Sequence, residues 1–273
     1  MNRLDELVEV DAKNISRWRE RLSELDRELP EAFDTAAEMF RTFSRCISGG
    51  GDQVRVEELR EIVDSDVWNH ARPLVARLLV FLLLERQYMW AATDLLRGRL
   101  TPALGYKRLQ AESLALLLLM RDDSEIASRW LEMMPDDEGR AFYRAFQGRI
   151  RGVIDSVGLS RAYEMGSGVA LHVRPSSAAH SLSIFPGPPL DIQLSYQEVR
   201  DSDPFSYFLE VLHFLTTQKL IFGELAAAFP EATDPIWHER VRLFGRTVDS
   251  LWEKLERNYA GHCARFLTML EET

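Results

Sequence analysis

The chain has 273 residues, 46% of them hydrophobic and 28% charged, and a formal net charge of −10. This length and composition are typical of a globular protein with one large domain or two small ones. The negative charge disfavours sequence-independent binding to a nucleic acid backbone, although Arg144, Arg149 and Arg151 form a local basic cluster. Cys46 and Cys263 give neither a disulfide framework nor a metal-ligand spacing, and the charged N-terminus lacks the apolar stretch of a signal peptide. We therefore expect a cytoplasmic protein that does not enter a membrane.

The first fifty residues predict a helical hairpin. Apolar residues follow one another at spacings of mostly four and three along its first helix: Leu4, Val8, Ile15, Trp18, Leu22, Leu25 and Leu29. Pro30 ends this helix, and a second apolar stripe covers residues 33–47. Such a narrow stripe is typical of an interface between helices, so the hairpin is expected either to form a homo-oligomer or to pack on its own domain. Gly49, Gly50 and Gly51 then divide the chain into a hairpin of residues 1–48 and a main helical domain of residues 52–273.

The middle of the chain predicts two long helices, and the second is expected to be the most buried element of the fold. The first runs over about residues 73–98, and Thr101 and Pro102 begin the second as N-cap and first helical residue. From Leu114 to Met120 every position is apolar, so other helices must surround this one on all sides. The apolar runs are too short to cross a bilayer. Shorter helices are expected around residues 56–63, 124–134 and 138–156.

The helical period is lost between residues 157 and 203, where glycines and prolines interrupt the chain. This stretch is too apolar to be disordered, so we expect an ordered loop region with one short helix and a pair of short strands. The strands are expected at residues 181–185 and 191–196, and two further helices at residues 204–229 and 235–271. The sequence therefore predicts an all-α fold, a multi-helix bundle with an irregular insert at about residues 157–203.

Six polar residues form the candidate site. Arg108 and Glu112 lie four residues apart, and hence on one face, just before the apolar run of the central helix. The insert supplies a phenol, a hydroxyl, an imidazole and a guanidinium that can satisfy a buried ion pair: Tyr163, Ser167, His172 and Arg174. We expect one hydrogen-bonded cluster that either fastens the insert to the central helix or binds a ligand, with His172 as general base or anion contact. The alternative is that the ion pair is exposed.

The same residues carry a resemblance. An Arg-x3-Glu helix followed some fifty residues later by Tyr-x3-Ser-x4-His resembles a family of all-helical bacterial proteins of unknown function. That family is in turn similar to HEPN-type and abortive-infection helical domains. The resemblance covers residues 106–180 and implies a helical fold with a polar site. The function expected first is a binding or interaction protein, in stress response or phage defence, whose partner is a small ligand or another protein.

The alternative function is a metal-independent ribonuclease of the HEPN type. Such enzymes carry Arg-x4–6-His on a helix, with the arginine polarising a phosphate and the histidine moving a proton. The chain offers Arg257-x4-His262 and Arg174-x5-His180, about as many matches as chance predicts. Under this alternative Arg257 and His262 are catalytic and RNA is the substrate; otherwise no nucleic acid partner is expected. The sequence leaves open whether the protein is an enzyme.

Neither a metal site nor a cofactor is expected. Glu210-x2-His213 has a spacing used in di-iron helical bundles, but such sites need a second motif of this kind and two further carboxylates. His213 is therefore expected to be a core histidine whose hydrogen bonds are satisfied. The chain has no phosphate loop and no dinucleotide fingerprint.

Overall fold

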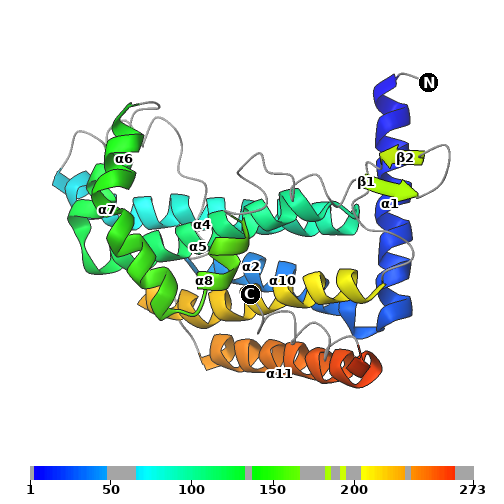
Figure 1. The fold of residues 1–273 in the computed structure, drawn as a ribbon. Helices are drawn as coiled ribbons and strands as arrows, with labels where there is room; N and C mark the ends of the chain where they lie inside the picture. Colours follow the sequence, from blue (N-terminus) through cyan, green and yellow to red (C-terminus); the bar gives the residue numbers. More distant parts are fainter. Residues whose placement is uncertain are drawn as a thin grey trace.

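The computed structural model describes residues 3–47, 66–132, 137–166, 182–185, 191–194, 204–230 and 235–261. The prediction of an all-α helical bundle is confirmed, and the expected strand pair in the insert is present as well (Figure 1). The helices are α1 (Arg3–Leu25), α2 (Glu28–Ile47), α4 (Asp66–Leu96), α5 (Leu100–Asp122), α6 (Ser124–Leu131), α7 (Asp137–Ser156), α8 (Ser160–Met165), α10 (Pro204–Ala228) and α11 (Pro235–Asn258). The antiparallel strands are β1 (Leu182–Phe185) and β2 (Asp191–Leu194), with Leu182 opposite Leu194.

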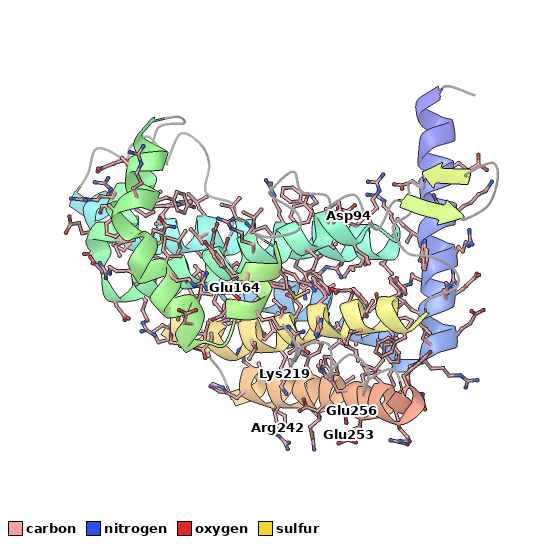
Figure 2. The ribbon with its side chains drawn as sticks, viewed as in Figure 1. Asp94, Glu164, Lys219, Arg242, Glu253 and Glu256 are labelled. Atoms are coloured by element: carbon pink, nitrogen blue, oxygen red, sulfur yellow. The ribbon has the colours of Figure 1, made fainter. Side chains whose placement is uncertain are left out.

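Helix α5 occupies the centre of the bundle. It contacts α4, α6, α7, α8 and α10, and every residue from Leu114 to Met120 is buried, as its uniformly apolar sequence predicts. α4 lies alongside α5, α10 lies below them, and α11 covers the outer side of α10 (Figure 1). Charged side chains of α11, among them Arg242, Glu253 and Glu256, point away from the bundle (Figure 2).

Two predicted helix starts are wrong, and a third is confirmed. α4 begins at Asp66 and continues through Pro73, at the cost of one backbone hydrogen bond. α5 begins at Leu100, so its N-cap is Arg99 and not Thr101. The reason is the turn before it, where Gly98 has a φ of 71° and ends α4 in the left-handed conformation that glycine favours. α6 begins at Ser124 as expected, and the Asp123 side chain caps it by accepting a hydrogen bond from the backbone N–H of Glu125.

The apolar stripe of the N-terminal hairpin packs within its own chain. Trp18, Leu22 and Leu29 are fully buried, and the ring of Trp18 lies 4.9 Å from that of Tyr207 on α10. On α2, Phe40 contacts aromatic rings of α4 and α10, and all these side chains belong to one hydrophobic core. Of the two expectations for the stripe, packing on its own chain is therefore the one observed. The division at residues 48 and 52 stays a prediction, as does a homo-oligomer.

Polar side chains connect α5 to its neighbours inside this core. The amides of Gln110 and Gln218 on α10 exchange hydrogen bonds of 3.3 and 3.1 Å, and both residues are fully buried. Ser113 donates a hydrogen bond of 3.0 Å to Gln87 on α4. Because buried amides and hydroxyls are costly when unpaired, these bonds fix the register of α5 against both helices.

Candidate functional site

Helix α8 lies across α5, and the chain just after it approaches α5 very closely. A Cβ atom on Gly166 would stand 2.5 Å from the carbonyl oxygen of Leu104 and 2.6 Å from Cβ of Arg108. Only glycine fits at this distance without displacing the backbone of one partner. This contact holds α8 against the turn of α5 that carries Lys107 and Arg108, and a hollow lies on each side of α8.

The first hollow, which we call the Arg108 groove, contains part of the predicted cluster. Arg108 Nε donates to Glu112 Oε1 at 3.0 Å, and the guanidinium of Arg108 lies 4.9 Å from the ring centre of Tyr163. Arg151 on α7 lies 4.8 Å from the same ring. The Arg108 and Glu112 side chains are 24% and 16% exposed, so the alternative of an exposed pair is wrong. The groove measures about 410 Å³ and is otherwise lined by Tyr143, Arg144, Gln147 and Ile150.

The rest of the predicted cluster lies outside the described residues. This applies to Ser167, His172 and Arg174, so their role stays a prediction. What the structure brings together is Arg108, Glu112 and Tyr163, an arrangement that fastens α8 to the central helix. Fastening is one of the two roles expected from the sequence.

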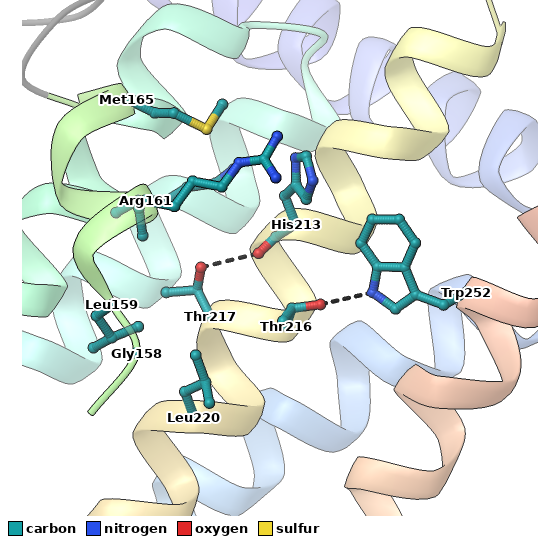
Figure 3. Close-up of a pocket in the computed structure, with 11 residues that line it drawn as sticks. Gly158, Leu159, Arg161, Met165, His213, Thr216, Thr217, Leu220 and Trp252 are labelled. Carbon is teal, nitrogen blue, oxygen red and sulfur yellow. Dashed lines mark hydrogen bonds between the residues drawn. The ribbon is translucent and has the colours of Figure 1, made fainter. Parts of the chain in front are cut away.

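The second hollow, which we call the α8 cavity, is more enclosed and contains different residues (Figure 3). It has a volume of about 270 Å³ and lies between α5, α8, α10, α11 and the turn before α8. Its walls combine cationic, hydroxyl and apolar side chains: Lys107, Leu159, Arg161, Ala162, Met165, His213, Thr216, Thr217, Leu220 and Trp252, with Gly158 at the turn.

Lys107 is a buried charge at the wall of the α8 cavity. Only 1% of its side chain is exposed, and its Nζ donates to Glu210 Oε2 of α10 at 3.2 Å. Burial lowers the pKa of Lys107, while the carboxylate of Glu210 opposes this change and the nearby Arg161 adds to it. A lysine in this position is stable only with its counter-charge, so α5 and α10 are joined by an ion pair next to the cavity.

His213 contributes an imidazole with an unused hydrogen-bonding atom. Burial lowers the pKa of His213 to about 4, with Lys107 and Arg161 acting in the same direction and Glu210 against it. The ring is therefore neutral at pH 7, with one nitrogen as donor and the other as acceptor. Its Nδ1 is buried and has no hydrogen-bond partner among the described protein groups. Among the described residues the expectation of a satisfied core histidine is not met: the residue is half-buried, and its Nδ1 has no partner there.

Arg161 and two threonines complete the polar part of the α8 cavity. In Figure 3 the guanidinium of Arg161 reaches from α8 to the His213 ring, and it makes no hydrogen bond or ion pair within the described residues. The Thr216 hydroxyl donates to a backbone carbonyl and accepts from the Trp252 indole at 2.8 Å. The Thr217 hydroxyl donates to the His213 carbonyl at 2.9 Å. Both hydroxyl protons are therefore engaged, which leaves the Arg161 guanidinium and the His213 imidazole N–H as donors without a partner among the described residues.

The residues of the ribonuclease alternative are only partly described. Arg257 lies exposed near the end of α11, and His262 and His180 fall outside the described residues, so this alternative stays a prediction. Among the side chains that the structure describes, no group of three or more His, Cys, Asp and Glu residues is placed to hold a metal ion. In the same part of the chain, no helix combines the length and apolar character needed to span a membrane.

Sequence reasoning missed most of the α8 cavity. Lys107 lies beside Arg108 in the chain but on another face of α5, and a single lysine in a helix carries no sign of burial. Arg161 and Trp252 come from helices distant in sequence. Only the pattern Leu212-His213-Phe214, a histidine between apolar residues, could have indicated the site.

Comparison with known proteins adds no further constraint. The chain was compared with protein-family models, with curated proteins and with solved structures, and none of them matches it. The resemblance to HEPN-type and abortive-infection helical domains therefore stays a prediction, and the function must be argued from the geometry of the chain itself.

Proposed function

We propose that this is a small-molecule-binding protein whose ligand occupies the α8 cavity. One observation carries the proposal: nitrogen groups from three helices, on Lys107, Arg161 and His213, converge on a cavity whose other walls are largely apolar. A largely apolar pocket with a few convergent polar groups is the usual form of a small-molecule site. A buried imidazole nitrogen without a partner among the described residues is costly beside such walls, and a ligand that bonds to the ring would offset part of that cost. The guanidinium of Arg161 is exposed, so water hydrates it in the free protein and a ligand can reach it.

The arrangement favours binding over catalysis. The Lys107 ammonium is held by Glu210, and the hydroxyls of Thr216 and Thr217 donate to backbone carbonyls, so none of them is prepared as a nucleophile. His213 lies three residues from Glu210 on the same helix, but no carboxylate accepts a hydrogen bond from its Nδ1 among the described groups. A neutral, unoriented imidazole is better suited to contact a ligand than to relay a proton.

The Arg108 groove has a supporting role in this proposal. Arg108 and Arg151 hold Tyr163 between them, and Tyr163 is part of α8, whose other side chains Arg161, Ala162 and Met165 close the cavity. The residues predicted from sequence thus position the wall of the binding site. We place the protein in the cytoplasm, on the sequence features given above, as part of the same proposal.

Ligand-observed NMR with a set of small carboxylates, amides, alcohols and amines tests this function. Ala162→Phe adds a ring at the cavity wall, and Ala145→Phe makes the same change at an exposed position of α7 as a matched control. We expect at least one class of probe to bind the wild type and the control but not Ala162→Phe. Thr217→Leu, which fills the cavity from α10, should act like Ala162→Phe and replaces it if that variant does not fold. Probes that bind all four proteins alike, or none of them, would refute the proposal.

A further inference from the structure

Among the residues that the structure describes, the charges around the α8 cavity do not balance. Lys107 is neutralised by Glu210 at 3.2 Å, and His213 is neutral at pH 7 because burial lowers its pKa to about 4. The guanidinium of Arg161 remains, with no ion pair in the described part of the chain and with its head beside the His213 ring (Figure 3). Arg161, an exposed residue, is therefore the one cationic side chain of the cavity without a counter-charge among the described residues.

We propose that the ligand of the α8 cavity is a small monocarboxylate with an unbranched apolar tail. A carboxylate matches the planar fork of a guanidinium and also accepts a hydrogen bond from an imidazole N–H. A single negative charge neutralises Arg161, whereas a doubly charged phosphate would bring an excess negative charge close to Glu210. This inference rests on the function proposed above and specifies the class of ligand.

The shape of the cavity supports the apolar tail. His213 and Leu220 lie seven residues apart on α10, which is two helical turns or about 10 Å. Towards the Leu220 end the wall consists of Leu159 and the turn at Gly158, so the cavity becomes apolar away from the cationic end (Figure 3). A carboxylate placed at Arg161 would direct its alkyl chain along α10 towards this end.

Binding should also depend on pH in a defined direction. Among the described residues, the charged groups that face His213 are Lys107 from α5, Arg161 from α8 and Glu210 from its own helix, while α11 contributes the uncharged indole of Trp252. A bound carboxylate adds a negative charge and raises the pKa of His213. The complex then binds a proton more readily than the free protein, so affinity increases as the pH falls from 7 towards 5.

Isothermal titration calorimetry of the full chain tests the ligand class with acetate, butyrate, hexanoate, hexanamide and inorganic phosphate. Hexanoate should bind about tenfold or more tightly than hexanamide, because a hydrogen bond to a charged group is stronger than one to an amide. Affinity should rise from acetate to hexanoate by up to about fourfold per methylene, the value expected for a buried CH₂ group. Phosphate should bind more weakly than hexanoate.

Two arginine variants test whether Arg161 binds the carboxylate, one as the test and one as its control. Arg161→Gln should weaken hexanoate binding by about tenfold or more, and Arg144→Gln, an exposed position in the Arg108 groove, should leave it unchanged. Equal affinity for hexanoate and hexanamide, or binding insensitive to Arg161→Gln, would overturn the carboxylate and leave small-molecule binding intact. Tight binding of phosphate with no gain from tail length would also overturn it. If neither these probes nor the small carboxylates, amides, alcohols and amines of the NMR experiment bind, the proposed function itself is wrong.

Discussion

Replacing Glu210 by glutamine should destabilise the protein more than replacing Lys107 by methionine, although both changes remove the same ion pair. The asymmetry comes from burial: the Lys107 side chain is 1% exposed, whereas that of Glu210 is 19% exposed and can be hydrated when alone. Glu210→Gln leaves an ammonium buried without a counter-charge. Lys107→Met leaves a carboxylate in contact with water and fills the buried position with an apolar chain of similar length.

The free energies follow from known costs of buried charge. Breaking a buried pair by removing one partner costs about 3–5 kcal/mol. Deprotonating a lysine of ordinary pKa, about 10.4, costs about 5 kcal/mol at pH 7, and loss of the Lys107 proton therefore sets this ceiling. We therefore expect about 3 kcal/mol for Glu210→Gln and about 1 kcal/mol for Lys107→Met. The double variant should resemble Lys107→Met, which gives a coupling energy of about 3 kcal/mol.

Urea denaturation followed by circular dichroism, at pH 7 and pH 9, measures these differences. In Glu210→Gln the stranded Lys107 has a folded-state pKa far below its unfolded value, so the unfolded chain binds more protons and stability rises with pH. This variant should therefore recover up to about 3 kcal/mol relative to the wild type between pH 7 and pH 9. Equal destabilisation by the two single variants, or no recovery at pH 9, would show that the burial of Lys107 does not set the cost of breaking this ion pair.

Three further predictions concern stability. Lowering the pH from 7 to 5 should reduce the free energy of unfolding of the wild type by about 2 kcal/mol, because the pKa of His213 is about 4 in the folded chain and about 6.5 in the unfolded chain. In urea titrations at both pH values, His213→Gln should remove this pH-dependent loss. Gly166→Ala should cost about 1–3 kcal/mol, since its Cβ would lie 2.5 Å from the Leu104 carbonyl oxygen; an unchanged melting temperature would contradict this close approach. Glu112→Gln should lower the free energy of unfolding by more than the roughly 0–1 kcal/mol typical of an exposed pair, because Arg108 and Glu112 are mostly buried. A smaller loss would show that water solvates the pair.

Much of the fold could be predicted because it follows from local patterns. A run apolar on every side, Leu114 to Met120, has only one stable environment, and the strand pair around residues 182–194 follows from short apolar stretches between turn residues. The start of α5 could not be located this way. It depends on the left-handed turn at Gly98, which also brings the backbone against the ring of Trp18 from α1.

Less of the candidate site than of the fold could be predicted from the sequence. Arg108 and Glu112 could be paired from their spacing, since neighbours on a helix are fixed by its geometry. The burial of Lys107 could not be predicted in this way, because it depends on α8 and α10. These helices cover that face of α5 and lie about 50 to 100 residues further along the chain. For His213 the sequence indicated a buried ring but could not show that its Nδ1 lacks a partner.

The indole N–H of Trp252 is the most direct reporter of the α8 cavity. It donates to Thr216 at 2.8 Å, and its ring lies 5.3 Å from that of His213 at the cavity wall. In ¹⁵N–¹H correlation spectra its signal, assigned with Trp252→Phe, should shift and saturate as hexanoate is added, and the indole of the exposed Trp90 on α4 should not move. If Trp252 stays unshifted, or shifts no more than Trp90, while a probe binds the protein, the ligand does not occupy the α8 cavity.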